Sequence, residues 1–336
     1  MRSILSALLL GTVAVTTASA EGVVNLYSSR HYDTDERLYS DFTAATGIEI
    51  NRIEGNADEL IARMEAEGVN SPADVLITVD AGRIWRAVDK GLLQPTTSEV
   101  LEERIPASVQ HPDNLWFGFS ERARMIFYAK DRVDTPPQTY ADLADPAYQG
   151  KICIRSATNI YNLSLLGAII AHEGEENAKA WAEGVKANLA RDPQGGDTDQ
   201  LRGIVSGECD IALVNSYYFA RAIRTEVEGV SEGIDNIGWV FPDQGGNGTH
   251  INISAAGMAA HAPNAENAVK FLEYLSSEQA QAYFSAGNDE YPVVEGAELS
   301  PNVAGLGAFE EDELNLSALG ENQATAERIF NETGWE

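Results

Sequence analysis

CDIALVNSYY, which runs from Cys209 to Tyr218, is the stretch on which both the fold and the site depend. Its first half is a compact apolar run, which predicts a buried strand. From Ser216 to Arg224 the spacing predicts a helix with Ser216 as its N-cap. Tyr217 and Tyr218 therefore follow a strand at the edge where open α/β sheets bind their ligands. Taken alone, the tyrosine pair also fits two side chains packed at the edge of the core.

The N-terminus predicts export. Arg2 precedes an apolar run from Ile4 to Val15, and a small-residue cleavage pattern follows at 18–20. We expect residues 1–20 to be a secretory signal peptide. The apolar run is too short to span a membrane, and no later stretch is long enough either, so we expect a soluble mature protein.

Composition limits the classes of partner. The 336 residues exceed one ordinary core, which favours two lobes. The formal net charge is -29 and the acidic residues are spread along the chain. Such a chain is a poor candidate for binding nucleic acid or an anionic membrane.

The two cysteines, Cys153 and Cys209, both lie in strand-like runs. In an exported protein an even count favours a disulfide, and this bridge would tie neighbouring strands together. Two cysteines this far apart do not suggest a zinc site.

Strand and helix patterns alternate along the first part of the mature chain. Strands are expected at 23–27, 48–53 and 73–78, and helices follow them around Leu38 to Ala45, over 57–67 and around Ile84 to Val88. This alternation predicts an α/β fold with right-handed βαβ units on a largely parallel sheet. Residues that follow these strands, His31 and Tyr32 among them, are expected at the ligand-binding edge.

Longer β-rich segments indicate where the chain passes between lobes. We expect one crossover at 115–128 and the return crossover at the strand 237–242. Between them the pattern predicts a strand at 151–155 and helices at 162–172, 178–188 and 199–206. Further helices are expected at 265–275 and 277–285. The predicted lobes are 21–118 plus about 246–290, and 119–245 plus about 291–336.

Five segments, spread in order over nearly the whole mature chain, resemble the ferric-ion-binding periplasmic proteins of ABC transporters, in particular their tyrosine-rich FutA/FbpA branch. They are YSSRHYDTD (27–35), SPADV (71–75), WFGF (116–119), NIYN (159–162) and NSYY (215–218). The resemblance implies a type II periplasmic-binding-protein fold, in which two transferrin-like lobes close on one Fe³⁺ in the cleft between them. It also implies a periplasmic monomer that delivers iron to an ABC permease in the inner membrane.

The ligand pattern of that family carries over to Tyr32 from the first lobe and to Tyr161, Tyr217 and Tyr218 from the second. His31 occupies the position of a histidine that either ligates the metal or forms a hydrogen bond at the site. Physical chemistry agrees with this ligand set, because Fe³⁺ is a small, hard cation that prefers anionic oxygen.

Four phenolates carry one negative charge more than Fe³⁺ carries positive, so a compensating cation is expected nearby. Arg122 and Arg124 are candidates because they lie beside the crossover. Strand alternation places both on one face and so does not distinguish them, whereas the family pattern favours Arg122. Arg221, one turn beyond Tyr218, is a third candidate. Each of these arginines fits an ordinary ion pair equally well.

Two other functions remain open at this point. The same fold binds polyamines, thiamine or sugars, but that use predicts Trp and Phe in the cleft loops, where this chain has tyrosines. An exported enzyme is the second alternative, yet the sequence contains neither G-x-S-x-G nor H-E-x-x-H. Because four tyrosines and a histidine can fill the coordination sphere, we expect no obligatory synergistic anion.

Overall fold

The computed structural model describes residues 22–30, 32 and 34–335. The predicted signal peptide and His31 lie outside these residues. Among the described residues, no helix combines the length and the apolar character that a membrane span requires.

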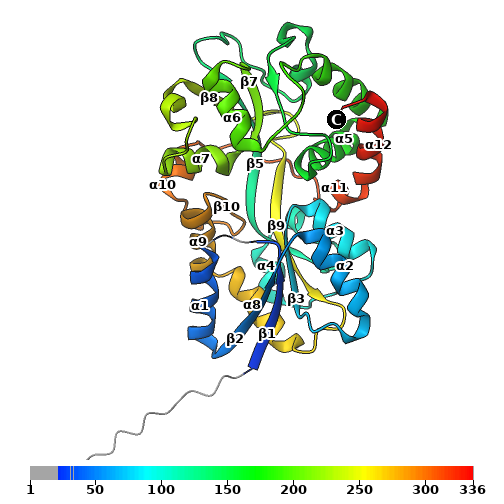
Figure 1. Ribbon diagram of the computed structural model, residues 1–336. Helices are drawn as coiled ribbons and strands as arrows, with labels where there is room; N and C mark the ends of the chain where they lie inside the picture. The colour runs from blue at the N-terminus through cyan, green and yellow to red at the C-terminus, as the bar shows by residue number, and fades with distance from the viewer. Residues whose placement is uncertain (1–21, 31, 33, 336) are drawn as a thin grey trace, which may run out of the picture.

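The described part of the chain forms ten strands and twelve α-helices, and Figure 1 shows their arrangement. The strands are β1 (Gly22–Ser28), β2 (Ile48–Glu54), β3 (Val75–Val79), β4 (Leu93–Gln94), β5 (Phe117–Ala129), β6 (Ile152–Cys153), β7 (Ile211–Asn215), β8 (Ile237–Val240), β9 (Ile251–Ala259) and β10 (Tyr291–Pro292). The helices are α1 (Asp35–Thr46), α2 (Ala57–Glu67), α3 (Ala81–Asp89), α4 (Glu99–Arg104), α5 (Ile160–Ala187), α6 (Asp197–Ser206), α7 (Ser216–Arg224), α8 (Ala265–Leu275), α9 (Glu278–Asn288), α10 (Pro301–Ala304), α11 (Ser317–Glu321) and α12 (Gln323–Thr333).

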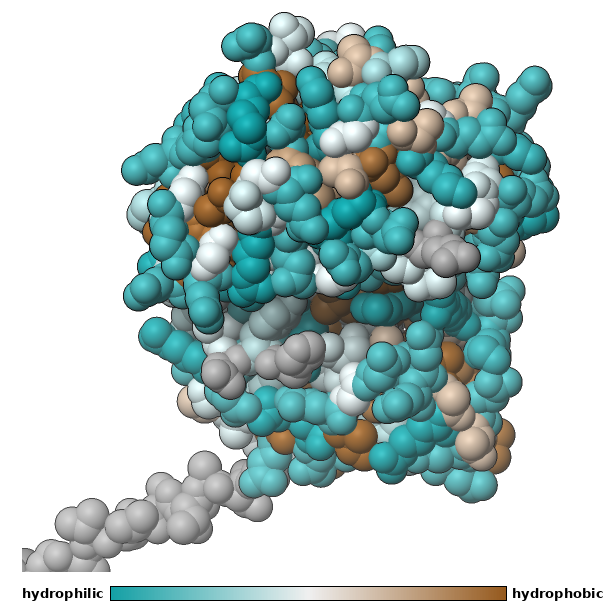
Figure 2. All heavy atoms as spheres, turned by 45° about the horizontal axis from the view of Figure 1, so that its top comes forward, coloured by the Kyte–Doolittle hydropathy of each residue, from teal (hydrophilic) through white to brown (hydrophobic). Residues whose placement is uncertain are grey.

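Two lobes share one mixed sheet with the strand order β2-β1-β3-β9-β5-β7-β6. β1 pairs in parallel with β2 and β3 in the first lobe, as the βαβ pattern predicts, and β6 pairs in parallel with β7 in the second. The long strands β5 and β9 run antiparallel from one lobe to the other (Figure 1). Figure 2 shows a hollow across one face of the molecule, between the lobes.

The prediction of the return crossover was wrong. The strand expected at 237–242 is β8, which pairs with β5 inside the second lobe. The chain returns through β9, which pairs with β5 on one side and with β3 of the first lobe on the other. β9 is nine consecutive buried residues of mixed size, INISAAGMA, so it shows neither alternation nor a strong apolar run.

Local signals account for most of the helices, with one correction. Gly47, at φ 72°, ends α1 as predicted. The helices expected at 162–172 and 178–188 are the two parts of α5, which the non-helical Gly174 (φ 82°) separates. The N-cap of α7 is Asn215, not Ser216. The Ser216 hydroxyl instead accepts a hydrogen bond from the Ala123 backbone N–H of β5, at 3.2 Å.

Hydrophobic packing follows the lobes. One cluster surrounds β1, β3 and β9 and includes Phe42 and Phe271. Two further clusters cover the faces of the second lobe's strands, one with α5 and α12, the other with α6 and α7. The expected disulfide, Cys153–Cys209, lies in the last of these clusters. It joins the end of β6 to the residues just before β7, with the two Cα atoms 5.8 Å apart.

Gly203 of α6 packs directly against this disulfide. A Cβ atom at this position would lie 2.8 Å from the Cys209 sulfur and 3.1 Å from the Cys153 sulfur. Such distances are shorter than atoms tolerate, so only glycine fits beside the bridge.

Loss of the bridge is expected to destabilise the protein. It closes a loop with a sequence separation of 56, so replacing both cysteines by alanine should lower the free energy of unfolding by about 2–4 kcal/mol. Urea unfolding of the two proteins measures the difference. Mass analysis after alkylation, with and without reduction, is the control, and two freely alkylated thiols in unreduced exported protein would contradict the prediction.

Candidate metal centre

Three of the four predicted tyrosine ligands come from two helix N-termini of the second lobe. Tyr161 lies in the first turn of α5, where the Asn159 side chain caps the helix by accepting the Tyr161 N–H at 3.1 Å. Tyr217 and Tyr218 lie in the first turn of α7, directly after β7. The N-terminus of a helix carries a partial positive charge, so both positions favour a phenolate.

These three side chains converge. The hydroxyls of Tyr161 and Tyr217 lie 3.2 Å apart, within hydrogen-bonding distance. The rings of Tyr217 and Tyr218 pack with their centroids 4.2 Å apart. The turn from strand to helix therefore does what the sequence predicted: it directs adjacent side chains to one place.

Tyr32 approaches from the first lobe. It follows β1 and is partly buried. Burial raises the pKa of Tyr32 to about 12, and the carboxylate of Glu290 and the phenol of Tyr161 act in the same direction.

Tyr217 and Tyr218 resist ionisation for the same reasons. Burial raises the pKa of Tyr217 well above its usual range, and Tyr161, Tyr218 and Tyr32 raise it further. Burial and Tyr161 also raise the pKa of Tyr218. Tyr32, Tyr217 and Tyr218 therefore favour the neutral phenol until a strong cation stabilises the anions.

Both candidate arginines of β5 are buried. The carboxylate partner of Arg122 belongs to the first lobe, and that of Arg124 belongs to the second. Arg122 donates to Ser254 of β9 at 3.2 Å and lies 3.6 Å from Glu290. Arg124 pairs with Asp197 at 2.8 Å, and its guanidinium lies 5.8 Å from the centre of the Tyr161 ring. Strand alternation predicted that the two arginines share one face of β5, but it did not indicate that each pairs with a different carboxylate.

Arg221 lies close to the rings of both Tyr217 and Tyr218. Its guanidinium carbon is 5.7 Å from the centre of the Tyr217 ring and 5.9 Å from that of Tyr218. This distance suits a cation–π contact, which the spacing of one helical turn made possible.

Two further arginines of the site were missed by the sequence reasoning. The buried Arg30 pairs with Asp35 at 2.9 Å and with Glu290 at 3.2 Å, and its guanidinium lies 4.8 Å from the Tyr32 ring centre. Arg155 lies 5.0 Å from the Tyr161 ring centre. Arg30 stands two residues before Tyr32, which was an available signal; no local pattern marks Glu290.

Conventional metal ligands do not gather elsewhere. Within residues 22–30, 32 and 34–335, no group of three or more His, Cys, Asp and Glu side chains is arranged to hold a metal ion. The four predicted tyrosines carry phenol oxygens, which suit a hard cation.

Comparison with known proteins places this geometry in a family. Residues 70–306 match the family described as bacterial extracellular solute-binding protein. The chain belongs to this family. It is 48% identical to iron uptake protein A1 of Synechocystis sp., over 95% of this chain and 89% of that protein.

Solved structures agree with the family assignment and with the two-lobed periplasmic-binding-protein fold. The Trichodesmium protein titled IdiA and FutA, in complex with iron and citrate ligands, shares 49% identity over 94% of this chain and 100% of that chain, with a TM-score of 0.91. Apo FutA2 from Synechocystis shares 47% identity over 94% and 99%, with a TM-score of 0.89.

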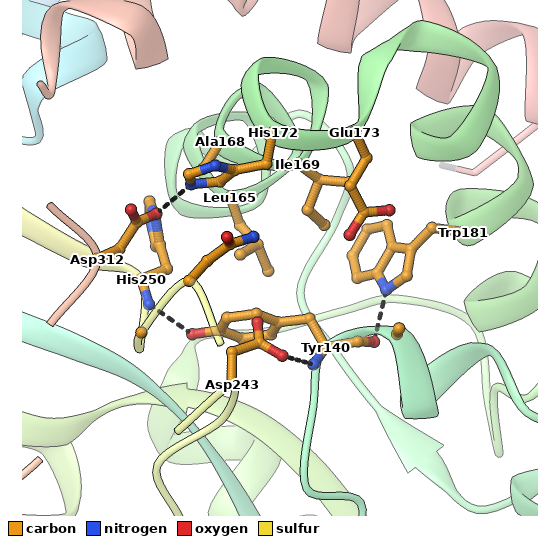
Figure 3. A pocket seen from close by; sticks show the side chains of 13 residues that line it. Tyr140, Leu165, Ala168, Ile169, His172, Glu173, Trp181, Asp243, His250 and Asp312 are labelled. Carbon is orange, nitrogen blue, oxygen red and sulfur yellow. Dashed lines mark hydrogen bonds and ion pairs between the residues drawn. The ribbon is translucent and has the colours of Figure 1, made fainter. Parts of the chain in front are cut away.

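A separate cavity of about 30 Å³, lined by none of the four candidate ligand tyrosines, lies in the second lobe of this solute-binding protein (Figure 3). The Tyr140 hydroxyl at its edge donates to the Arg124 carbonyl of β5 at 2.6 Å and accepts from the His250 N–H, just before β9, at 3.2 Å. Tyr140 thus joins the two crossover strands. The cavity has room for about one water molecule.

His250 at this junction makes stability depend on pH. Burial lowers the pKa of His250 to about 3, and the charges of Arg124 and Arg122 and the His172 ring act in the same direction. The unfolded chain takes up this proton near pH 6.5, so stability is full above that pH and is lost as the pH falls toward 3, by up to about 1.4 kcal/mol per pH unit. His250→Asn should flatten this slope.

Thermal melting of wild type and variant at pH 7, 6, 5 and 4 measures the slope. Replacement of His261, which is exposed, is the matched control and should leave it unchanged. Parallel wild-type and His250→Asn curves would contradict the prediction.

Proposed function

We propose that this protein captures Fe³⁺ between its lobes and delivers it to an ABC permease for iron uptake. The ligands are Tyr32, Tyr161, Tyr217 and Tyr218, and His31 either ligates the metal or forms a hydrogen bond to a ligand. One observation carries this proposal: the Tyr161 and Tyr217 hydroxyls lie 3.2 Å apart. The Tyr32 phenol of the other lobe also contributes to the raised pKa of Tyr217.

The donor set favours a ferric ion over an organic cargo. A sugar, polyamine or thiamine is held by stacking and by scattered hydrogen bonds, whereas here phenol oxygens converge on one point. Buried phenols ionise only against a strong positive charge, and Fe³⁺ supplies more of it than a divalent ion. The iron and citrate reported for the Trichodesmium relative agree with this choice.

Arginines offset the excess negative charge of four phenolates. Arg122 lies on the first-lobe side and Arg124 on the second-lobe side, and Arg221 and Arg155 flank the rings. The carboxylate partners of Arg122 and Arg124 hold these two buried cations in place before the metal enters, so binding requires little rearrangement of charge.

The remaining roles complete the proposal. Residues 1–20 direct export to the periplasm, where the protein works as a monomer and binds no nucleic acid and catalyses no reaction. The moving lobes are 21–118 plus about 246–290, and 119–245 plus about 291–336. That no synergistic anion is obligatory stays a prediction.

Removal of one phenol oxygen is the direct test of the ligands. Tyr217→Phe or Tyr218→Phe keeps the ring, so the apo protein should melt as wild type does, while ferric affinity falls at least tenfold and the visible tyrosinate-to-iron absorption weakens. Titration with ferric citrate, followed by absorbance, measures both.

Tyr148→Phe is the matched control, because the Tyr148 hydroxyl donates to the Thr135 carbonyl at 3.1 Å, outside the cluster. Unchanged ferric affinity in both site variants would remove these tyrosines from the ligand set.

Acid should release the metal. The ligands are neutral phenols without iron and phenolates with it, so each bound ion displaces up to four protons, and protons compete with the metal as the pH falls. Ferric occupancy should therefore decrease from pH 7.5 to pH 5, and the radius of gyration should rise as the cleft opens. Absorbance and small-angle scattering across this range test the expectation; occupancy that stays flat would contradict it.

A further inference from the structure

Asp80 lies between β3 and α3 and has a φ of 92°, a backbone conformation that residues other than glycine rarely adopt. Its carboxylate is fully buried. A conformation this unfavourable persists only where the surroundings hold it, and such residues concentrate at functional sites.

The first lobe and its crossover strand hold Asp80 in place. Its backbone N–H donates to the Ile253 carbonyl of β9 at 2.8 Å. Its carboxylate accepts from the Gly82 N–H at 2.8 Å and from the Asn252 side chain at 2.9 Å. Asn252 lies opposite Arg122 in the ladder between β9 and β5. Asp80 is thus attached to the strands that join the lobes.

The same carboxylate reaches the second lobe. The Ser164 hydroxyl of α5 donates to Asp80 at 2.7 Å, and both side chains are completely buried. Close packing surrounds this contact: a Cβ atom on Gly82 would lie 3.3 Å from Ile160 of α5. Figure 1 shows α3 in the lower lobe facing α5 and α11.

Ser164 stands one helical turn after Tyr161, so the two side chains share a face of α5. We propose that Asp80 is a positioning residue for ferric capture: through Ser164 it holds the N-terminus of α5, and with it Tyr161, at the distance from the first lobe that Tyr32 needs to share the metal. This inference rests on the proposed function and adds a residue that touches no ligand atom.

Ser164→Ala tests the contact, because it removes the cross-lobe hydrogen bond and leaves the Asp80 contacts within the first lobe intact. A hydrogen bond to a charged group affects an equilibrium by roughly tenfold or more. Iron release to a competing chelator should therefore be roughly tenfold faster, while the absorption maximum of the ferric form stays in place because all four tyrosines remain. The apo variant should also have a larger radius of gyration.

Ser276→Ala is the matched control, since this buried hydroxyl donates to the Glu273 carbonyl at 2.8 Å within one lobe. Asp80→Gly is the second variant, because glycine accepts the positive φ and is tolerated at an N-cap. In the Asp80→Gly background, Ser164→Ala should add nothing to the release rate.

The outcomes separate positioning from simple stability. If Ser164→Ala releases iron at the wild-type rate, the proposal is overturned, whatever the melting temperature of the variant. It is also overturned if Ser164→Ala changes the release rate equally in the wild-type and Asp80→Gly backgrounds. If wild type itself develops no ferric absorption, the proposed function fails, and the radius of gyration of apo Ser164→Ala still decides whether Asp80 holds the lobes together.

Discussion

The pairing of β5 with β9 is the constraint on which the rest of the molecule depends. These two antiparallel strands belong to both lobes at once, from Phe117↔Ala256 to Ala123↔Ile251. Neither strand ends at the boundary, so each lobe completes its sheet with residues from the same ladder. A change of angle between the lobes must therefore bend this ladder, and the side chains that it carries move with it.

Charge in the site is organised around the same ladder. Arg122 and Arg124 stand two residues apart on β5, yet one pairs toward Glu290 and the other with Asp197. The two lobes thus each bring a cation, already held by a carboxylate, to a group of phenols in which burial raises the pKa of Tyr32, Tyr217 and Tyr218. Metal entry changes the protonation of the phenols, whereas the cations are in position beforehand.

Local sequence patterns were sufficient to predict those features of the fold that neighbouring residues determine. The α/β alternation, the glycine that ends α1 and the turn from β7 to α7 all follow from residues close together in the chain. The disulfide followed instead from the even cysteine count of an exported chain. β9 could not be found in this way, because INISAAGMA is buried on all sides and its small residues serve packing against β3 and β5. The tyrosine ligands were predicted from the combination of strand ends and family resemblance, and they stay a prediction. The charged partners Glu290 and Asp197 were missed, since their role arises from contacts between residues far apart in sequence.

The close contact between Gly203 and the disulfide has an evolutionary consequence. While Cys153 and Cys209 are bridged, the space beside their sulfurs excludes every side chain at position 203. A lineage that loses the cysteines regains that space, and larger residues at 203 become permissible only afterwards. The three positions are therefore not free to drift independently: the order in which they change is restricted, with the glycine retained for as long as the bridge is.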